Sequence, residues 1–259
     1  MNSSPFAQRD KCESTLLAVA LLAYSNGIAL YAHRSGEYPN SIFRRLNLYV
    51  LAALMAHAGS GRGGLAAVGL RREGFGRSLV GGAVLGFSLS APPLFFLYKP
   101  ILLDTPLEYG PISKLTRREL AGELFLRLPL HVALLEEVAF RGLLYRALRR
   151  QMSPERAIGL SATAFALWHF AVTAASAAQT NLDSAARLPL PLRSHVQLIA
   201  VLGGMLSTGL AGVGFALLRE RSGNLAGPVL AHWLVDGAVV AALWGRSHTF
   251  DEREDDRAD

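Results

Sequence analysis

Two adjacent glutamates, Glu136 and Glu137, lie within a segment that is apolar enough to be expected to cross a membrane. An ionised carboxylate at the centre of a bilayer costs roughly 2.5–3.5 kcal/mol on insertion scales, so such residues usually have a function. Two later apolar segments place His169 and His232 at similar depth, and Asp236 follows His232 by four residues. Carboxylates and imidazoles that meet inside one helix bundle can transfer protons and activate water, which indicates proton-transfer or hydrolytic chemistry within the membrane.

The spacing along one helix assigns different roles to the two glutamates. Glu137 and Arg141 are four residues apart, so they are neighbours on a helix, with the acid on the N-terminal side, which is the better order for an ion pair. Glu136 is rotated about 100° from Glu137, because a turn takes about 3.6 residues. We therefore expect Glu137 and Arg141 to form a structural ion pair and Glu136 to act as a general base. The alternative is that both glutamates line the polar end of a helix.

The histidine motifs are weak when each is taken alone. His169 follows Phe165 by four residues, so the two share a helix face, and a single histidine on an apolar face is more often a packing residue than a catalyst. His232 and Asp236 are also one turn apart, and such a pair can fix an imidazole tautomer, bind a metal ion or line a polar seam. Because acids and imidazoles occur in three apolar segments of one chain, we interpret them together as one site.

The composition predicts a membrane protein. Hydrophobic residues make up 51% of the 259 residues, the mean hydropathy is +0.28, and 18% of the residues are charged, below the roughly 25% that is typical of soluble domains. The net charge of +6 comes from basic residues that cluster at the ends of apolar segments, where they contact lipid headgroups, so we expect no nucleic-acid partner. The single cysteine, Cys12, excludes an intramolecular disulfide and a cysteine-based metal site.

We predict an all-α fold, a polytopic bundle of transmembrane helices. Apolar segments that approach bilayer length, about 20 residues, occur at seven places, namely 15–32, 46–58, 78–98, 119–145, 157–177, 195–218 and 224–245. The segment 46–58 is short and is followed by a glycine-rich stretch. The segment 15–32 is similar to a signal peptide but lacks a convincing cleavage site, so we expect a retained membrane anchor.

The sequence divides into three parts. Residues 1–118 are expected to form variable N-terminal transmembrane helices and loops, and residues 119–245 form a membrane domain that holds all the candidate residues. Residues 246–259 form an acidic tail that we expect to be disordered. Within the second part, the segment 195–218 carries small residues at four-residue spacing, which predicts close helix packing, and we assign it no chemistry.

The order of the motifs resembles that of the CPBP family, the CAAX-processing and bacteriocin-processing intramembrane proteases, also called the Abi family. The resemblance covers about residues 119–245 and rests on Glu-Glu-x-x-x-Arg, Phe-x-x-x-His and His-x-x-x-Asn/Asp motifs, which correspond to Glu136, Glu137, Arg141, Phe165, His169, His232 and Asp236. It implies an all-helical membrane fold with a conical cavity and a glutamate-dependent endopeptidase activity. By this resemblance Glu136 and His169 would activate water. His232 and Asp236 would stabilise the oxyanion, and the remaining motif residues would support the site.

Two points of the mechanism stay open at the level of the sequence. Family members often carry asparagine where this chain has Asp236, and an ionised aspartate cannot donate a hydrogen bond to an oxyanion, so Asp236 is either protonated or orients His232. A zinc site of Glu136, His169 and His232 is stereochemically possible, but the His-Glu-x-x-His motif of zinc proteases is absent. We favour a mechanism without a metal ion or another cofactor.

These observations predict an intramembrane endopeptidase that cleaves a membrane-associated protein or peptide in a bacterial plasma membrane. A leader peptide or a C-terminal sorting or anchor signal is the expected substrate. The alternative is a non-catalytic scaffold or bacteriocin-immunity protein that retains the fold, and it predicts that Glu136→Ala preserves function. A proton-coupled transporter is a third interpretation, because buried acids and histidines also mark ion paths, but the sequence shows no matching helix breaks in two related halves.

Overall fold

A computed structural model describes residues 5–35, 41–61, 63–98, 103, 105–185, 187, 192 and 194–258. Over these residues the chain is helical and forms no β-strand, apart from an isolated bridge between Tyr109 and Thr180. Its helices, in chain order, are α1 (Pro5–Ser35), α2 (Ser41–Ser60), α3 (Gly64–Ala67), α4 (Phe75–Tyr98), α5 (Gly110–Ser113), α6 (Arg117–Gly122), η1 (Glu123–Ala133), α7 (Leu134–Glu137), η2 (Val138–Leu144), α8 (Tyr145–Arg149), α9 (Pro154–Trp168), α10 (Phe170–Ala177), α11 (Leu182–Ala185), α13 (Val196–Ser222) and α14 (Ala226–Ala258). The predicted all-α class is confirmed.

Helices that can cross a membrane account for most of the bundle. In the described part of the chain five segments are long and apolar enough, namely Lys11–Ser35, Phe75–Tyr98, Pro154–Ala177, Val196–Ser222 and Ala226–His248. The other two predicted spans are also helical, 46–58 within α2 and 119–145 within the stretch from α6 to α8, but they are not among these five. The second of them carries the charged motif residues, which lower its hydropathy. The protein is a multi-pass membrane protein.

The two glutamates lie in one uninterrupted helical stretch that runs from α6 to α8. Thr116 caps its N-terminus by accepting a hydrogen bond from the backbone N–H of Glu119, and the Glu119 carboxylate accepts one from the Thr116 N–H. The elements η1 and η2 are π-helical, and Pro129 lies inside η1. Because π-helical turns frequently occur at functional sites, the short α-helix α7 between them is a natural place for catalytic side chains.

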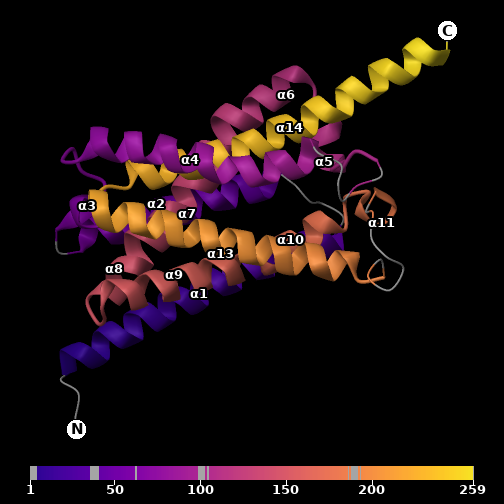
Figure 1. The fold of residues 1–259 in the computed structure, drawn as a ribbon. Coiled ribbons are helices and arrows are strands. Elements are labelled where there is room, and N and C mark those ends of the chain that lie inside the picture. The colour runs from indigo at the N-terminus through magenta and orange to yellow at the C-terminus, as the bar shows by residue number, and fades with distance from the viewer. Residues whose placement is uncertain are drawn as a thin grey trace.

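The long helices pack in two groups, α4 with α14, and α13 with α9, α10 and α1 (Figure 1). The helices α4 and α14 approach each other closely at Gly82, where a Cβ atom would lie 2.4 Å from the carbonyl oxygen of Gly227, so this contact requires glycine. The hydroxyl of Ser78 accepts a hydrogen bond from the backbone N–H of Gly227 (2.8 Å) at the same place. The stretch that carries the glutamates contacts helices of both groups, and the side chains of Glu136, Glu137 and Arg141 are buried between them.

The helix α14 continues beyond the bundle. Its backbone is helical through Ala258, where the sequence predicted a disordered tail for residues 246–259. Each residue added to an existing helix gains a hydrogen bond without a new nucleation step, so a helix anchored in the membrane extends readily. Figure 1 shows this end of α14 projecting from the bundle, far from the N-terminus. The division of the chain into three parts stays a prediction.

Candidate active site

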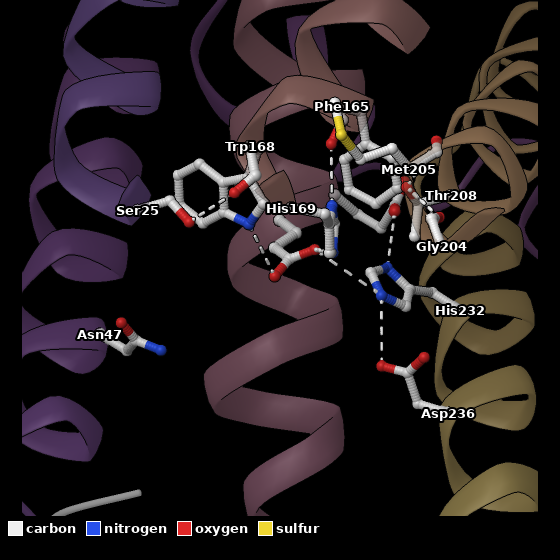
Figure 2. A network of polar contacts seen from close by, with 12 residues as sticks. Ser25, Asn47, Phe165, Trp168, His169, Gly204, Met205, Thr208, His232 and Asp236 are labelled. Carbon is white, nitrogen blue, oxygen red and sulfur yellow. Dashed lines mark hydrogen bonds and ion pairs between the residues drawn. The ribbon is translucent and has the colours of Figure 1, made fainter. Parts of the chain in front are cut away.

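The four residues with predicted catalytic roles come together from three places in the bundle, as Figure 2 shows for the two histidines and Asp236. Glu136 lies on α7, His169 lies between α9 and α10, and the others lie on α14. The Oε2 atom of Glu136 is 3.6 Å from Nε2 of His169 and 3.7 Å from Nε2 of His232. The Oδ2 atom of Asp236 is 3.4 Å from the same nitrogen of His232. Two carboxylates and two imidazoles therefore meet at one point.

Glu137 and Arg141 form a fully buried ion pair, as their four-residue spacing predicted. The Nη1 atom of Arg141 is 2.9 Å from Oε1 of Glu137, and neither side chain is exposed to solvent. The guanidinium also lies over the ring of Phe165, with its Cζ atom 4.0 Å from the ring centroid, and at 5.1 Å from that of Phe215. Cation–π contacts of this kind stabilise a buried cation. The guanidinium of the ion pair is thus packed against the rings of Phe165 and Phe215.

Glu137 has a second partner, which the spacing did not predict. Its Oε1 atom also lies 2.9 Å from Nδ1 of His232. Because Glu137 is paired with Arg141 it acts as an acceptor, so Nδ1 of His232 carries a hydrogen and donates it. This contact fixes the orientation of the imidazole and turns Nε2 toward Glu136 and Asp236. The ion pair therefore supports the site by holding His232 as well as itself.

His169 lies at a break in the apolar segment that the sequence predicted as one span. The helix α9 ends at Trp168 and α10 begins at Phe170. The Nδ1 atom of His169 is 2.8 Å from the carbonyl oxygen of Phe165, so Nδ1 donates to it. In the neutral imidazole Nε2 is then the unprotonated nitrogen, and this is the atom that faces Glu136. Phe165 thus orients His169 through its carbonyl group, and its ring packs edge-on against the imidazole.

Two further side chains contact the site and were given no role from the sequence. The indole Nε1–H of Trp168 donates a hydrogen bond to Oε1 of Glu136 (3.1 Å). The ring of Phe215, on α13, stacks on the imidazole of His232 with centroids 5.3 Å apart. The position of Trp168 directly before His169 is a signal that could have been used, whereas nothing near Phe215 in the sequence points to His232. The segment 195–218 therefore contributes a residue to the site, in addition to packing.

Solvent exposure of the side chains shows where the site opens. The exposed fraction rises from 0% for Glu137 and 9% for Glu136 to 16% for His169 and 35% for Asp236. A groove of about 410 Å³ adjoins Asp236 between α4, η1 and α14, and the next residue, Gly237, is part of its lining. The predicted catalytic residues are not among those that line this groove, so it lies beside the site. The conical cavity that the resemblance implies stays a prediction.

The donor geometry bears on the question of a metal ion. Among the described residues, no group of three His, Cys, Asp or Glu side chains is arranged to hold a metal ion. Both Nδ1 atoms of the site histidines already bond to protein acceptors, so a zinc ion would have to bind the two Nε2 atoms and Oε2 of Glu136. These are the same atoms that would contact a water in a metal-free mechanism.

Comparison with known proteins supplies a family. The family model of the type II CAAX prenyl endopeptidases, described as Rce1-like, matches residues 121–238. The matched segment contains all the motif residues, from Glu136 to Asp236. Neither the curated proteins nor the solved structures gave a match. Over residues 121–238 this multi-pass membrane protein is therefore similar to the CAAX-type proteases, in agreement with the resemblance of its motifs to the CPBP family.

Proposed function

We propose that the protein is an intramembrane endopeptidase of the glutamic type, which hydrolyses a peptide bond in a membrane-associated protein or peptide. The observation that carries this proposal is the Oε2 atom of Glu136, which is buried and makes no hydrogen bond with the described residues. The Nε2 atoms of His169 and His232 lie 3.6 and 3.7 Å from it. Both separations exceed direct hydrogen-bond distance, so neither imidazole occupies this oxygen, and its lone pairs stay free to accept a proton from a water. This carboxylate is suited to activate such a water.

In the first step Glu136 takes a proton from the water as the water oxygen attacks the carbonyl carbon of the scissile peptide. Trp168 occupies Oε1, which leaves Oε2 to face the water. The unprotonated Nε2 atom of His169 is a second acceptor beside it. When the carbon–nitrogen bond breaks, the proton passes from Glu136 or His169 to the leaving amine, so the base of the first step is the acid of the second. We propose that these steps need no metal ion.

His232 stabilises the negative charge that develops on the carbonyl oxygen. With Nδ1–H held by Glu137, a proton on Nε2 is directed toward the space between Glu136 and Asp236. The imidazolium form is therefore flanked by carboxylates, and it can donate to the oxyanion from a fixed position. Preorganised donors of this kind act without reorganisation during the reaction, and the loss of one typically lowers kcat about 10²–10³-fold.

Asp236→Asn tests the part that the aspartate takes in this step. We expect the variant to keep activity within about tenfold of wild type, and Asp236→Ala to lose about 10²-fold, the scale of a lost oxyanion donor. Asparagine preserves the contact with His232 and adds an N–H donor, whereas alanine removes both. The measurement is kcat of the purified variants on the same peptide. Equal losses in Asn and Ala variants would show that the negative charge of Asp236 is required.

The position of the site indicates the substrate class. Its partly exposed members, His169 and Asp236, lie on helices that are apolar enough to span the membrane. The scissile bond must therefore enter the membrane domain, which an apolar segment in the substrate favours. A leader peptide and a C-terminal sorting or anchor signal both carry such a segment, and we propose substrates of this kind in a bacterial plasma membrane.

The decisive experiment compares protein termini in membranes from cells that express wild type or Glu136→Ala. We expect new termini in the wild type that vanish in the variant, because the base is lost. Glu13→Ala is the matched control, since Glu13 is an exposed carboxylate whose ion-pair partner in the described part of the chain is Arg150 on the surface. Identical termini in all three samples, with Glu136→Ala still complementing a deletion, would instead support a non-catalytic scaffold or immunity protein.

A further inference from the structure

Two adjacent side chains of α1, Ser25 and Asn26, form hydrogen bonds with the backbone at the break between α9 and α10. We call these two residues the Ser25–Asn26 clamp. The hydroxyl of Ser25 donates a hydrogen bond to the carbonyl oxygen of Trp168 (2.8 Å), and Figure 2 shows Ser25 directed at this residue. The side-chain amide of Asn26 donates to the carbonyl oxygen of Leu167 (3.1 Å). Its oxygen accepts from the backbone N–H of Ala171 (2.9 Å). The clamp thus satisfies three backbone groups on both sides of His169.

These backbone groups need partners because the helix is interrupted there. The ends of a helix leave backbone groups without a partner inside the helix. At the end of α9 the carbonyl groups of Ala166 and Leu167 accept from backbone N–H groups at the cap, and the clamp adds side-chain bonds to the carbonyl groups of Leu167 and Trp168. The segment Pro154–Ala177 is one of the apolar spans, and in hydrocarbon an unsatisfied backbone group is costly. Ser25 and Trp168 are both buried, so water does not replace the hydrogen bond between them. The side chains of α1 therefore stabilise the break at this place.

The break carries two side chains that contact the proposed base. Trp168 is the last residue of α9 and donates to Oε1 of Glu136. His169 lies at the break itself and faces Oε2 of the same carboxylate. Since the clamp binds the backbone of Trp168 and of its neighbours, a shift of the clamp would move both side chains relative to Glu136.

A second polar connection runs from the same part of α1 toward the other catalytic segment. The ring of Tyr24 packs against the indole of Trp168, and its hydroxyl donates to Oδ1 of Asn47 on α2 (2.6 Å). The amide of Asn47 donates to the carbonyl oxygen of His131 in η1 (2.9 Å). The N-terminal helices therefore contact both the segment that carries His169 and the stretch that carries Glu136.

We propose that Ser25 and Asn26 are positioning residues of the protease site, which act through the backbone of residues 167–171 on Trp168 and His169. The helix α1 is then part of the catalytic unit, although it lies outside the matched segment 121–238. This inference rests on the proposed function and extends it to the N-terminal third of the chain. A misplacement of about 1 Å at reacting groups can lower a rate about 10²-fold, so the chemical step is sensitive to the clamp.

The test uses Ser25→Ala and Ser25→Ala/Asn26→Ala in the full-length protein, with two readouts. The first is 19F NMR of protein labelled with 5-fluorotryptophan, which needs no substrate. The chain has 3 tryptophans, and the other two bond to carbonyl groups elsewhere, Trp233 to Leu124 and Trp244 to Leu115. Single Trp→Phe variants assign the signals. The second readout is kcat and KM on a peptide that spans the cleavage site found by the comparison of termini.

We expect the double variant to shift the Trp168 signal and to leave the Trp233 and Trp244 signals in place. We also expect kcat of the double variant to fall about 10- to 100-fold with KM unchanged. Ser25→Thr keeps the hydroxyl, so we expect it to retain the wild-type Trp168 signal and the wild-type kcat. Ser35→Ala is the control on α1, because Ser35 is exposed and, among the described residues, its hydroxyl bonds only to Ala32 in its own helix. An unmoved Trp168 signal, or wild-type kcat, in a folded variant would overturn the inference.

The two readouts separate this inference from the proposed function. If the wild type cleaves no protein in the comparison of termini, the proposed function fails, and the 19F signal of Trp168 still decides whether the clamp positions this residue. If the double variant does not fold, Ser25→Ala alone, which removes one oxygen atom, is measured in the same way. A Trp168 signal that stays in place in folded Ser25→Ala would then overturn the inference.

Discussion

Glu136→Gln is expected to lower kcat about 10²–10⁴-fold, the range for loss of a general base, and to leave the protein folded in the membrane. Glutamine keeps the size of the side chain and can still accept the hydrogen bond from Trp168, but it cannot take a proton from water. The measurement is kcat of the purified variant, with thermal denaturation as the test of folding. Glu13→Gln, an exposed carboxylate on α1, is the matched control and should retain full activity.

The double variant Glu136→Gln/His169→Ala tests whether the two side chains act on the same water. His169 faces the same oxygen of Glu136, and the proposed mechanism has both side chains act on one water. Groups that act as a unit show strongly non-additive losses, so we expect the double variant to be little slower than Glu136→Gln alone. If the fold-losses in kcat of the two single variants multiply in the double variant, the side chains do not share one water. Full activity in Glu136→Gln would rule out the proposed mechanism.

Glu137→Leu and Arg141→Met are each expected to destabilise the protein by about 3–5 kcal/mol, because each leaves a buried charge without its partner. The ion pair is fully buried and its guanidinium lies among phenylalanine rings, so water cannot compensate the loss. The measurement is the apparent Tm in detergent together with the yield of monodisperse protein. Wild-type Tm values in both single variants would contradict a structural role of the pair.

The double variant Glu137→Leu/Arg141→Met distinguishes stability from function. Replacement of a buried ion pair by apolar side chains of similar volume is often neutral, so we expect most of the Tm to return. Activity should not return, because Nδ1 of His232 loses the acceptor that orients the ring. A double variant that regains full activity would show that Glu137 is not needed to hold His232.

The sequence by itself determined the helical membrane fold and the relations within each helix. Apolar segments of bilayer length predicted the long helices, because the hydrocarbon core leaves few other ways to satisfy the backbone. The pairing of Glu137 with Arg141 followed from their spacing, since side chains four residues apart on a helix are neighbours whatever the rest of the fold. The contact of His232 with Asp236 also follows from a spacing of four residues on one helix.

Only the tertiary structure decided which helix faces meet. The contacts of Glu137 with His232 and of Glu136 with Trp168 join residues 95 and 32 positions apart, and their geometry depends on how all the helices pack. Phe215 reaches His232 from a helix whose sequence indicated only packing.

The break at His169 shows the same dependence on distant residues. Neither glycine nor proline marks it in the sequence. It is stabilised by Ser25 and Asn26, whose side chains supply hydrogen bonds that the interrupted helix cannot make for itself. The residue types of the site could therefore be found from local spacing, whereas the backbone beside His169 is bonded to a helix more than 140 residues away in the chain.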